Sequence, residues 1–528
     1  MLTLNQLEGL LQQKKISRRE FIAHSALLGL ASASYPLFHP KLTQAITPKK
    51  GGRLRIGTPN GSTVDSLDPA LMISMSIILI NFGQLSNCLV EINHKNESVP
   101  ELAESWESSQ DAKKWIFKLR KGVEFHNSKT MDADDVISSL NHHRGKNSKS
   151  GAKPLLNPID TIKKDGKYNV IFTLNEGNTD FPYILSDFHL VIFPKDVRPD
   201  SGIFTGPYVI KDFEPGVRTF ATKNQNYFKS DRGHFDEIET LIMNDSNARI
   251  VALKTGQVDL VSDCDPKTVA LLKKLKGIQV IEQNGNRHYT YPMRCDTFPY
   301  NNNHVRLALK YSIDRDQMVK TILRGYGLAG NDHPIGINSR YYASELKQRT
   351  YDPDKAKFHL KKAGLGNHEF RFHTADNIYS GALDAAALYK ESAAKAGINI
   401  KIVRQPNDGY WDNVWLKKAW SASLWNGRPT EDMMLSTVYR AGAPWNETFW
   451  NHKRFNELLV KARTEWNEKK RSDMYFEMQR IIHDEGGAIV PMFVSDIAIA
   501  SDKIAHGPLS VYRELDGLKA AERWWFKG

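Results

Sequence analysis

Two short motifs place a serine and two lysines at spacings that could support acyl transfer. Ser150-Gly151-Ala152-Lys153 has the S-x-x-K spacing, and Lys254-Thr255-Gly256 matches K-T-G. In penicillin-interacting serine acylases the serine of the first motif is the nucleophile. The S-D-N element that belongs between the two motifs is absent, and K-T-G follows a predicted helix instead of forming a strand. A secreted serine acylase that uses Ser150 and Lys153 therefore stays only as an alternative function.

Other patterns typical of cofactor or metal sites lack the context that their chemistry needs. Residues 325–330 match G-x-G-x-x-G, which binds a pyrophosphate where a strand precedes it and a helix begins after it. Here a predicted helix precedes the motif and a loop follows it. His142-His143 is an adjacent pair, but the chain contains neither H-E-x-x-H nor C-x-x-C. We therefore expect no catalytic residues, no cofactor and no metal site.

The composition is that of a large globular protein. Its 528 residues are enough for roughly three to four domains. A mean hydropathy of −0.47 argues against a polytopic membrane protein. Three cysteines are too few for a disulfide framework, and their redox state stays open. The net charge is +12, but lysines and arginines alternate with acids along the chain, so we expect no nucleic-acid partner.

The first 45 residues have the features of an export signal. Lys14 and Lys15 precede Ser17-Arg18-Arg19-Glu20-Phe21-Ile22, and a moderately apolar run diluted by serine and glycine follows. The paired arginines followed by x-Phe-Ile resemble a twin-arginine signal. We expect cleavage after Ala45 and a soluble periplasmic product. The alternative is a retained membrane-anchoring helix, for which this run is short.

The elements that must position any site alternate between helix and strand. Alternating apolar residues predict strands at 53–57, 115–120, 168–174, 259–261, 398–403 and 488–493. Helical periodicity predicts helices at 71–80, 246–255, 304–324, 354–363, 380–396 and 455–484, and one that begins at Asp132. Such alternation without long linkers or repeats predicts packed α/β lobes.

A series of motifs in register along the chain carries a family resemblance. They are Glu101-Leu102-Ala103-Glu104-Ser105-Trp106, residues 115–126, Asp132-Ala133-Asp134-Asp135-Val136, Thr205-Gly206-Pro207-Tyr208, Asn226-Tyr227-Phe228, residues 253–259, 305–315 and 351–364. Together they resemble the family 5 extracellular solute-binding proteins, the dipeptide-, oligopeptide- and nickel-type receptors of ATP-binding-cassette (ABC) importers. The resemblance covers essentially the whole chain after the export signal.

The resemblance implies a fold and a role. The implied fold is α/β, a two-lobed periplasmic binding protein (type II, cluster C) with an extra inserted α/β domain. Residues 1–45 would be the signal peptide, 46–88 with 195–285 and 488–528 lobe I, 89–194 the inserted domain II, and 286–487 lobe III. A monomer of this kind binds a small solute by hinge closure, without catalysis, and delivers it to permease subunits in the inner membrane.

The resemblance also points to the ligand contacts. The peptide receptors have a Trp-x-x-Asp run whose carboxylate binds the peptide amino terminus, and the matching run here is Trp425-Asn426-Gly427-Arg428. An arginine fork suits a carboxylate or phosphate, which predicts a peptide-like, opine-like or other acidic ligand. Arg294, where the family more often has asparagine, would add a second cation. In the alternative, Arg428 pairs internally with Glu431 or Asp432 and leaves an ordinary peptide site.

Aromatic residues crowd the stretch before this run. Tyr410, Trp411, Trp415 and Trp420 lead up to Trp425. They could form walls of the ligand site or pack in the core, because Trp411 and Trp415 have helical spacing. The predicted ligand contacts are Arg428, Trp425, Asn426, Gly427, Asp432, Arg294, Trp411 and Tyr410. The same fold could also hold a metal chelate, haem or a sugar phosphate.

Overall fold

A nine-stranded mixed sheet is the largest element of the computed structural model, which describes residues 48–376 and 378–528. Eight strands follow the order β16-β12-β17-β11-β1-β10-β9-β8, and β13 pairs with β17 at the side. The strands are β1 (Arg53–Thr58), β8 (Tyr208–Glu214), β9 (Arg218–Lys223), β10 (Glu237–Ile242), β11 (Leu260–Val261), β12 (Ile278–Pro292), β13 (Gly327–Ala329), β16 (Ser423–Trp425) and β17 (Ala488–Ser501). The predicted signal sequence lies outside the described residues. No helix within them has the length and apolar content needed to cross a membrane.

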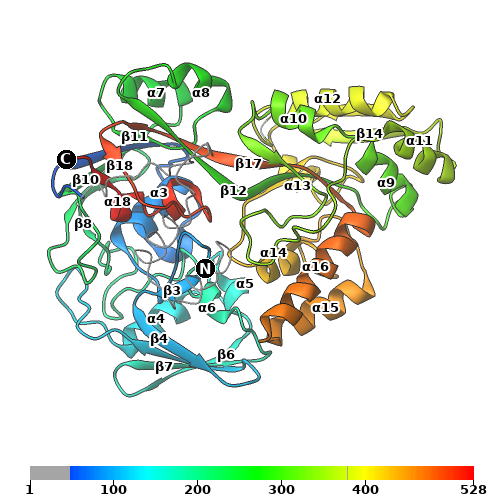
Figure 1. Cartoon of the computed structure of the whole chain (residues 1–528). Coiled ribbons are helices and arrows are strands. Elements are labelled where there is room, and N and C mark those ends of the chain that lie inside the picture. The colour runs from blue at the N-terminus through cyan, green and yellow to red at the C-terminus, as the bar shows by residue number, and fades with distance from the viewer. Residues whose placement is uncertain (1–47, 377) are drawn as a thin grey trace, which may run out of the picture. The chain divides into compact units, whose positions relative to one another are not determined.

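The antiparallel strands β12 and β17 connect two hydrophobic cores (Figure 1). Ile281 and Ala498 belong to one core, and Tyr289 and Met492, further along the same strands, belong to another. The first core, with the elements around it, is called the main region here, and the second lies in the helical region. Two continuous strands therefore form the covalent and hydrogen-bonded link between these regions.

The main region surrounds the parallel pair formed by β1 and β10. Its further elements are η1 (Pro69–Leu71), α3 (Met75–Ile80), η2 (Asn81–Leu85), α7 (Ser246–Lys254), α8 (Pro266–Leu272), α17 (Glu514–Gly517), α18 (Ala520–Arg523), β18 (Ile504–Ala505) and β19 (Trp525–Phe526). A Cβ atom on Gly206 would lie 2.2 Å from the Leu85 carbonyl carbon, so only glycine allows these two segments to approach. The core thus joins segments from both ends of the chain.

Residues 89–192 form the four-stranded region, which has its own core. Its antiparallel sheet has the order β4-β5-β7-β6. The elements are β2 (Val90–Ile92), β3 (Ser98–Pro100), β4 (Ala103–Ser108), β5 (Lys114–Leu119), β6 (Ile159–Asp165), β7 (Asn169–Leu174), α4 (Ala133–His142), α5 (Lys153–Leu156) and α6 (Phe181–Ile184). As the acidic first turn predicts, Asp132 caps α4 in a capping box with Asp135. Phe117, Phe172 and Phe181 meet edge-on in the core.

The helical region carries most of the long helices. Its elements are α9 (Asn303–Tyr311), α10 (Arg315–Thr321), α11 (Pro353–Lys362), α12 (Ala382–Ala394), α13 (Tyr410–Asn413), α14 (Glu431–Val438), α15 (Lys453–Thr464), α16 (Glu468–Glu485), β14 (Glu369–Thr374) and β15 (Asn399–Arg404). Strands β14 and β15 are parallel and pack with α12. The C-terminal ends of β12 and β16 enter this region, so its loops surround the strand that leads to Arg428.

Three predicted helices are shorter than their apolar patterns suggest. The prediction for 304–324 is divided into α9 and α10, because Asp314 starts a new helix by accepting a hydrogen bond from the Gln317 amide. Likewise Asn467 caps α16 and separates it from α15 within 455–484. The helix expected over 71–80 begins only at Met75. In each case a capping side chain starts a helix inside a stretch whose apolar spacing alone predicts one continuous helix.

Candidate functional site

Arg428 lies in the loop that joins β16 to α14. Strand β16 ends the sheet beside β12, and Trp425 stands opposite His288. The Thr430 side chain caps α14 by accepting a hydrogen bond from the Met433 amide at 3.2 Å. This loop therefore lies between the carboxyl end of a strand and the amino end of a helix, a place where α/β proteins commonly bind ligands.

The loop backbone approaches β12 so closely that position 427 requires glycine. A Cβ atom on Gly427 would lie 2.8 Å from the Asn286 Cβ atom. Asn426 is exposed, and Arg428 is half-buried with its guanidinium 5.9 Å from the centre of the Trp425 ring. Within the described residues Arg428 forms no ion pair, and its Nη1 donates only long hydrogen bonds to the Asn426 and Gly427 carbonyl oxygens.

The two acids that follow Arg428 have other partners. Glu431 accepts a hydrogen bond from the Tyr341 amide at 2.7 Å, and burial raises the pKa of its carboxyl to about 7. Asp432 accepts a hydrogen bond from Nε of Arg463 at 2.8 Å. The alternative in which Arg428 pairs with either acid is therefore wrong for this structure. The carboxylate of Asp432 is buried and binds Arg463, and its predicted ligand contact stays a prediction.

Arg294 lies far from Arg428 along β12. Its guanidinium pairs with Asp296 at 2.8 Å and lies 4.0 Å from the centre of the Phe449 ring. Gly427 packs at Asn286, and Arg294 follows eight residues later, a span of up to about 26 Å of extended chain. The structure gives the two predicted arginines different partners and does not bring them together, because an irregular stretch of β12 and the end of that strand at Pro292 lie between them.

Four tryptophan rings form a contiguous cluster beside the loop, which we call the tryptophan cluster. Trp415 touches Trp411, Trp425 and Trp445 with ring centres 5.9, 6.1 and 6.4 Å apart. The indole N–H groups of Trp415 and Trp425 donate hydrogen bonds to the buried Glu447 carboxylate at 2.8 and 3.0 Å. Burial raises the pKa of Glu447, while these hydrogen bonds oppose the rise. Trp411 and Trp445 remain 42% and 47% exposed.

Tyr410 belongs to the core, and its predicted ligand contact stays a prediction. Its ring is buried, and its hydroxyl donates a hydrogen bond to the Ala422 carbonyl oxygen at 2.8 Å. Trp420 is buried as well. The aromatic stretch therefore divides between the two predicted uses: Tyr410 and Trp420 pack inward, whereas Trp411 and Trp425 belong to the tryptophan cluster.

Three side chains outside the loop act electrostatically on Arg428, and no sequence pattern had selected them. They are Tyr512 and Arg513 of the main region and Asp187 of the four-stranded region. Burial is the main cause that lowers the pKa of Arg428, and Arg513 acts in the same direction, while Tyr512 and Asp187 oppose it.

An unusual backbone turn fixes the position of Arg513. The four residues 515–518 all have left-handed φ angles, of 52°, 61°, 67° and 68°. Each non-glycine residue in that conformation costs roughly 1–2 kcal/mol. Asp516 offsets this by accepting hydrogen bonds from the Ser510 amide at 2.6 Å and from Arg523 at 3.0 Å. Strain that is held by such ties is typical of functional segments.

The geometry around Ser150 does not fit a serine acylase. Its buried hydroxyl lies 2.7 Å from Nδ1 of His143 and accepts a hydrogen bond from the Ala152 amide. The Lys153 ammonium donates instead to the Lys146 carbonyl oxygen at 2.9 Å. The serine and lysine of the S-x-x-K motif therefore do not interact, and the alternative function loses its proposed base.

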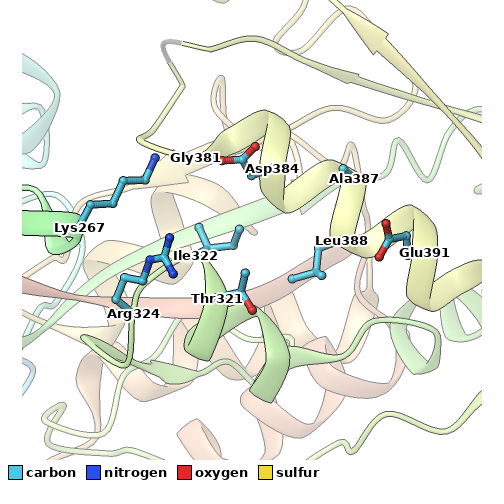
Figure 2. A pocket seen from close by; sticks show the side chains of 9 residues that line it. All are labelled: Lys267, Thr321, Ile322, Arg324, Gly381, Asp384, Ala387, Leu388 and Glu391. Carbon is cyan, nitrogen blue, oxygen red and sulfur yellow. The ribbon is translucent and has the colours of Figure 1, made fainter.

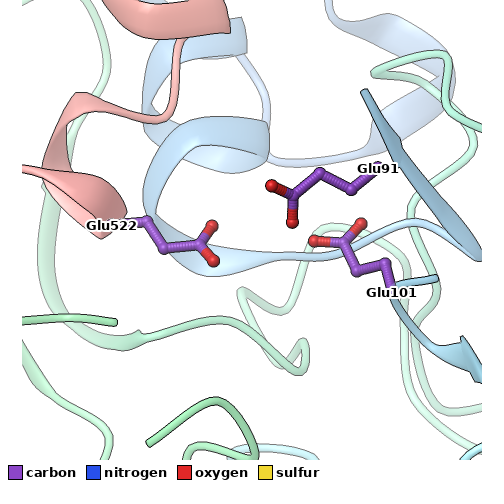
Figure 3. Close-up of side chains that lie close together, drawn as sticks. All are labelled: Glu91, Glu101 and Glu522. Carbon is purple, nitrogen blue, oxygen red and sulfur yellow. The ribbon is translucent and has the colours of Figure 1, made fainter. Parts of the chain in front are cut away.

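One group of three carboxylates in the described part of the chain is close enough to hold a metal ion, and an ammonium already lies among them. Glu91, Glu101 and Glu522 converge from three separate segments (Figure 3). The Lys229 Nζ atom lies 2.6, 2.8 and 2.9 Å from their oxygens. A metal ion would have to displace this cation from a buried, charge-balanced site. The cluster instead joins the four-stranded region to the C-terminal segment.

A pocket of about 330 Å³ lies elsewhere, between α8 and the helices α10 and α12. Figure 2 shows Lys267 and Arg324 on one side of it, with Asp384 and Glu391 on α12. None of the predicted site residues lines this pocket. The residues that carry the ligand prediction are therefore those of the β16–α14 loop.

The chain matches known proteins over most of its length. A sequence model described as "Bacterial extracellular solute-binding proteins, family 5 Middle" matches residues 97–447. The dipeptide-binding protein of Escherichia coli (strain K12) is 26% identical over 482 residues, covering 82% of this chain and 87% of that protein. Heme-binding protein A of Haemophilus influenzae (strain ATCC 51907 / DSM 11121 / KW20 / Rd) is 26% identical over 460 residues, covering 79% and 83%.

Solved structures confirm the expected fold. The periplasmic binding protein DppA of Helicobacter pylori, in complex with the peptide STSA, superposes with a TM-score of 0.75 at 24% identity, covering 91% of this chain and 99% of that one. The predicted two-lobed α/β fold of the type II binding proteins is thereby confirmed. Members of the matched family are solute-binding receptors of ABC importers. This chain belongs to the family 5 extracellular solute-binding proteins and is a receptor of that kind.

Proposed function

We propose that this receptor binds a small solute through an anionic group held at Arg428 and delivers it to an ABC permease without altering it. The observation that carries the proposal is the guanidinium of Arg428. It stands where the peptide receptors have a carboxylate, and it has no ion pair in the described residues. A half-buried arginine without a counterion gains most from a ligand that supplies one, because charge-assisted hydrogen bonds are the strong ones.

The surroundings of Arg428 support a ligand with an apolar or aromatic part next to its anionic group. Trp425 lies under the guanidinium, and the exposed rings of Trp411 and Trp445 continue the tryptophan cluster. Asn426 and Gly427 would offer backbone groups. Peptide-like and opine-like acids combine these features; haem, a metal chelate or a sugar phosphate would do so in part. The dipeptide- and heme-binding relatives show that the family accepts such different ligands.

The division into lobes supports binding by hinge closure. Separate hydrophobic cores in the main, four-stranded and helical regions support a division into lobe I (46–88, 195–285 and 488–528), domain II (89–194) and lobe III (286–487), although single residues of each core cross these bounds. Strands β12 and β17 would act as the hinge. A ligand that contacts Arg428 and the main region together would stabilise the closed state, which the permease would then recognise.

Export by the twin-arginine route, with cleavage after Ala45, is part of this proposal. The changes Arg18→Lys and Arg19→Lys together are expected to stop export of the full chain. The measurement is the amount and the N-terminal residue of the periplasmic protein. Normal periplasmic levels of the double variant, or a mature protein that still begins at Met1, would contradict it.

Native mass spectrometry of protein purified without denaturation tests the ligand class, because receptors of this kind can retain their solute. An additional mass that is released on denaturation, carries an acidic group and is recovered unchanged after long incubation is expected. A retained solute without an acidic group would count against the proposal. Chemical change of the released compound would show turnover.

Calorimetry with the identified solute then tests Arg428 itself. Charge-assisted hydrogen bonds contribute about 1.5–3 kcal/mol, so Arg428→Ala is expected to weaken binding roughly ten- to a hundredfold. Arg440→Ala is the matched control, because Arg440 is exposed and follows the same helix α14. If the Arg428 and Arg440 variants bind as well as the parent protein, the anionic ligand group does not lie at Arg428.

A further inference from the structure

Three rings of the tryptophan cluster, those of Trp415, Trp425 and Trp445, form a nearly equilateral triangle, which we call the tryptophan triangle. Their ring centres lie 6.1, 6.4 and 5.9 Å apart, and their planes are inclined to one another by 62°, 59° and 47°. No two of these rings are stacked face to face. A cation about 3 Å above the triangle would lie about 5 Å from each ring centre, within the ~6 Å range of a cation–π contact. One cationic group can therefore contact all three rings.

A buried carboxylate is bound to the tryptophan triangle. Glu447 is 2% exposed and accepts hydrogen bonds from the indole N–H groups of Trp415 and Trp425. A further donor is the Thr290 hydroxyl at 3.3 Å, and Glu447 forms no ion pair among the described residues. Neutral donors leave the negative charge of the carboxylate uncompensated, and hydrogen bonds to an anion polarise the indole rings in the direction that attracts a cation. The carboxylate and the rings thus favour the same kind of ligand group.

The tryptophan triangle is accessible from solvent and lies next to Arg428. Trp445 is 47% exposed, and the Arg428 guanidinium lies 5.9 Å from the centre of the Trp425 ring. An anionic group held at Arg428 and a group that contacts the triangle would therefore be close together in one ligand.

We propose that the tryptophan triangle binds an ammonium group of the ligand, next to the anionic group held at Arg428. The inference rests on the proposed function and narrows its ligand class to amphoteric acids: amino acids, short peptides or quaternary ammonium acids. A ligand of this class supplies a counterion to the Arg428 guanidinium and a cation to the rings that bind Glu447. Tryptophan is the aromatic side chain that attracts cations most strongly, and rings grouped around one point are typical of sites for quaternary ammonium groups.

Choline and its uncharged carbon analogue 3,3-dimethyl-1-butanol test the tryptophan triangle alone, because the two probes have the same shape and neither is an acid. Saturation-transfer NMR on the methyl signal gives the dissociation constant of each probe. Choline is expected to bind the parent protein roughly three- to thirtyfold more tightly than the analogue and to lose this advantage in Trp445→Leu. Trp445→Phe keeps a ring and should retain part of the advantage. Trp466→Leu is the matched control, because Trp466 is also 47% exposed but packs on Trp115.

Equal binding of the two probes, or the same loss in Trp466→Leu as in Trp445→Leu, would overturn the proposal. Absence of choline binding would overturn it as well, because it would mean that the Arg428 guanidinium already occupies the rings.

The solute found by native mass spectrometry provides the second test. It is expected to carry an amino or quaternary ammonium group besides its acidic group. Trp445→Leu is expected to weaken its binding roughly three- to thirtyfold, and Trp466→Leu to leave it unchanged. If binding depends on Arg428 but not on Trp445, the ammonium site is wrong and the proposed function stands. If it depends on Trp445 but not on Arg428, the anionic contact fails and the ammonium site stands.

Discussion

The ion pair between Asp180 and Arg471 joins the four-stranded region to helix α16. The Arg471 Nη2 atom lies 2.6 Å from Oδ2 of Asp180, and both side chains are almost fully buried. Nε of Arg471 donates to the Ala462 carbonyl oxygen at 3.0 Å. Beside the pair, the Thr179 amide donates to the Arg463 carbonyl oxygen at 2.8 Å. The pair is therefore buried on both sides, so the loss of either charge leaves the other buried without its counterion.

Asp180→Asn is expected to lower the free energy of unfolding by about 3–5 kcal/mol, the usual cost of removing one partner of a buried pair. Replacing both partners, as Asp180→Leu with Arg471→Met, is expected to recover most of that loss, because two apolar side chains need no counterion. The control is Asp473→Asn on the same helix, where an exposed pair with Lys469 should contribute little.

Urea unfolding followed by tryptophan fluorescence measures these effects, since Trp115 and Trp466 meet across the same contact with ring centres 6.0 Å apart. A midpoint for Asp180→Asn that equals that of Asp473→Asn would refute the reasoning, because it would mean that water reaches the pair. A double variant that is less stable than Asp180→Asn alone would refute the desolvation argument. Both outcomes can be read from the midpoint at constant slope.

Three further changes test other parts of the structure. Burial lowers the pKa of Lys310 to about 7. Between about pH 7 and 10.5 the unfolded chain therefore binds more protons than the folded protein, and the free energy of unfolding should rise with pH. Lys310→Met should flatten this rise in urea titrations at several pH values. Glu447→Gln should lose one of the two hydrogen bonds that the Glu447 carboxylate accepts from indole N–H groups, which should lower the free energy of unfolding by about 1.5–3 kcal/mol and shift tryptophan emission. Glu457→Gln on the surface should change neither stability nor emission. Arg428→Asp should lose the native solute in calorimetry, because repulsion replaces attraction for its anionic group, whereas Arg440→Asp should not; unchanged affinity of the Arg428 variant would contradict an anionic group at this position.

Local signals in the sequence were enough for most of the helices and strands. The alternation at 168–174 predicts β7, and the acids after Asp132 predict the start of α4. The sequence did not predict where one long apolar stretch divides into two helices. A cap such as Asp314 acts through one hydrogen bond and leaves the apolar spacing unchanged. The prediction for 488–493 found only the first part of β17, whose remaining residues gain their pairing from β12, some 210 residues away.

Part of the candidate site could be predicted only through the family motif. The run from Trp425 to Arg428 selects the loop, and the structure supplies its reason in the close approach of Gly427 to Asn286. Proximity in sequence does not show which way a side chain faces: Asp432 lies four residues from Arg428 but binds Arg463. Tyr410 is buried, while its neighbour Trp411 is exposed.

Arg513 shows why the rest could not be predicted. It is 85 residues from Arg428, lies in no recognisable motif and follows a tyrosine in a C-terminal segment of mixed composition. Its position depends on a left-handed turn that few sequences adopt, and that turn depends on Asp516 being bound by Ser510 and Arg523. Whether a charged residue is attracted or repelled depends on the charges of its neighbours in space, and only the fold shows which residues these are. The ligand group that suits Arg428 therefore depends on neighbours such as Arg513 and Asp187, which lie far from it in the sequence.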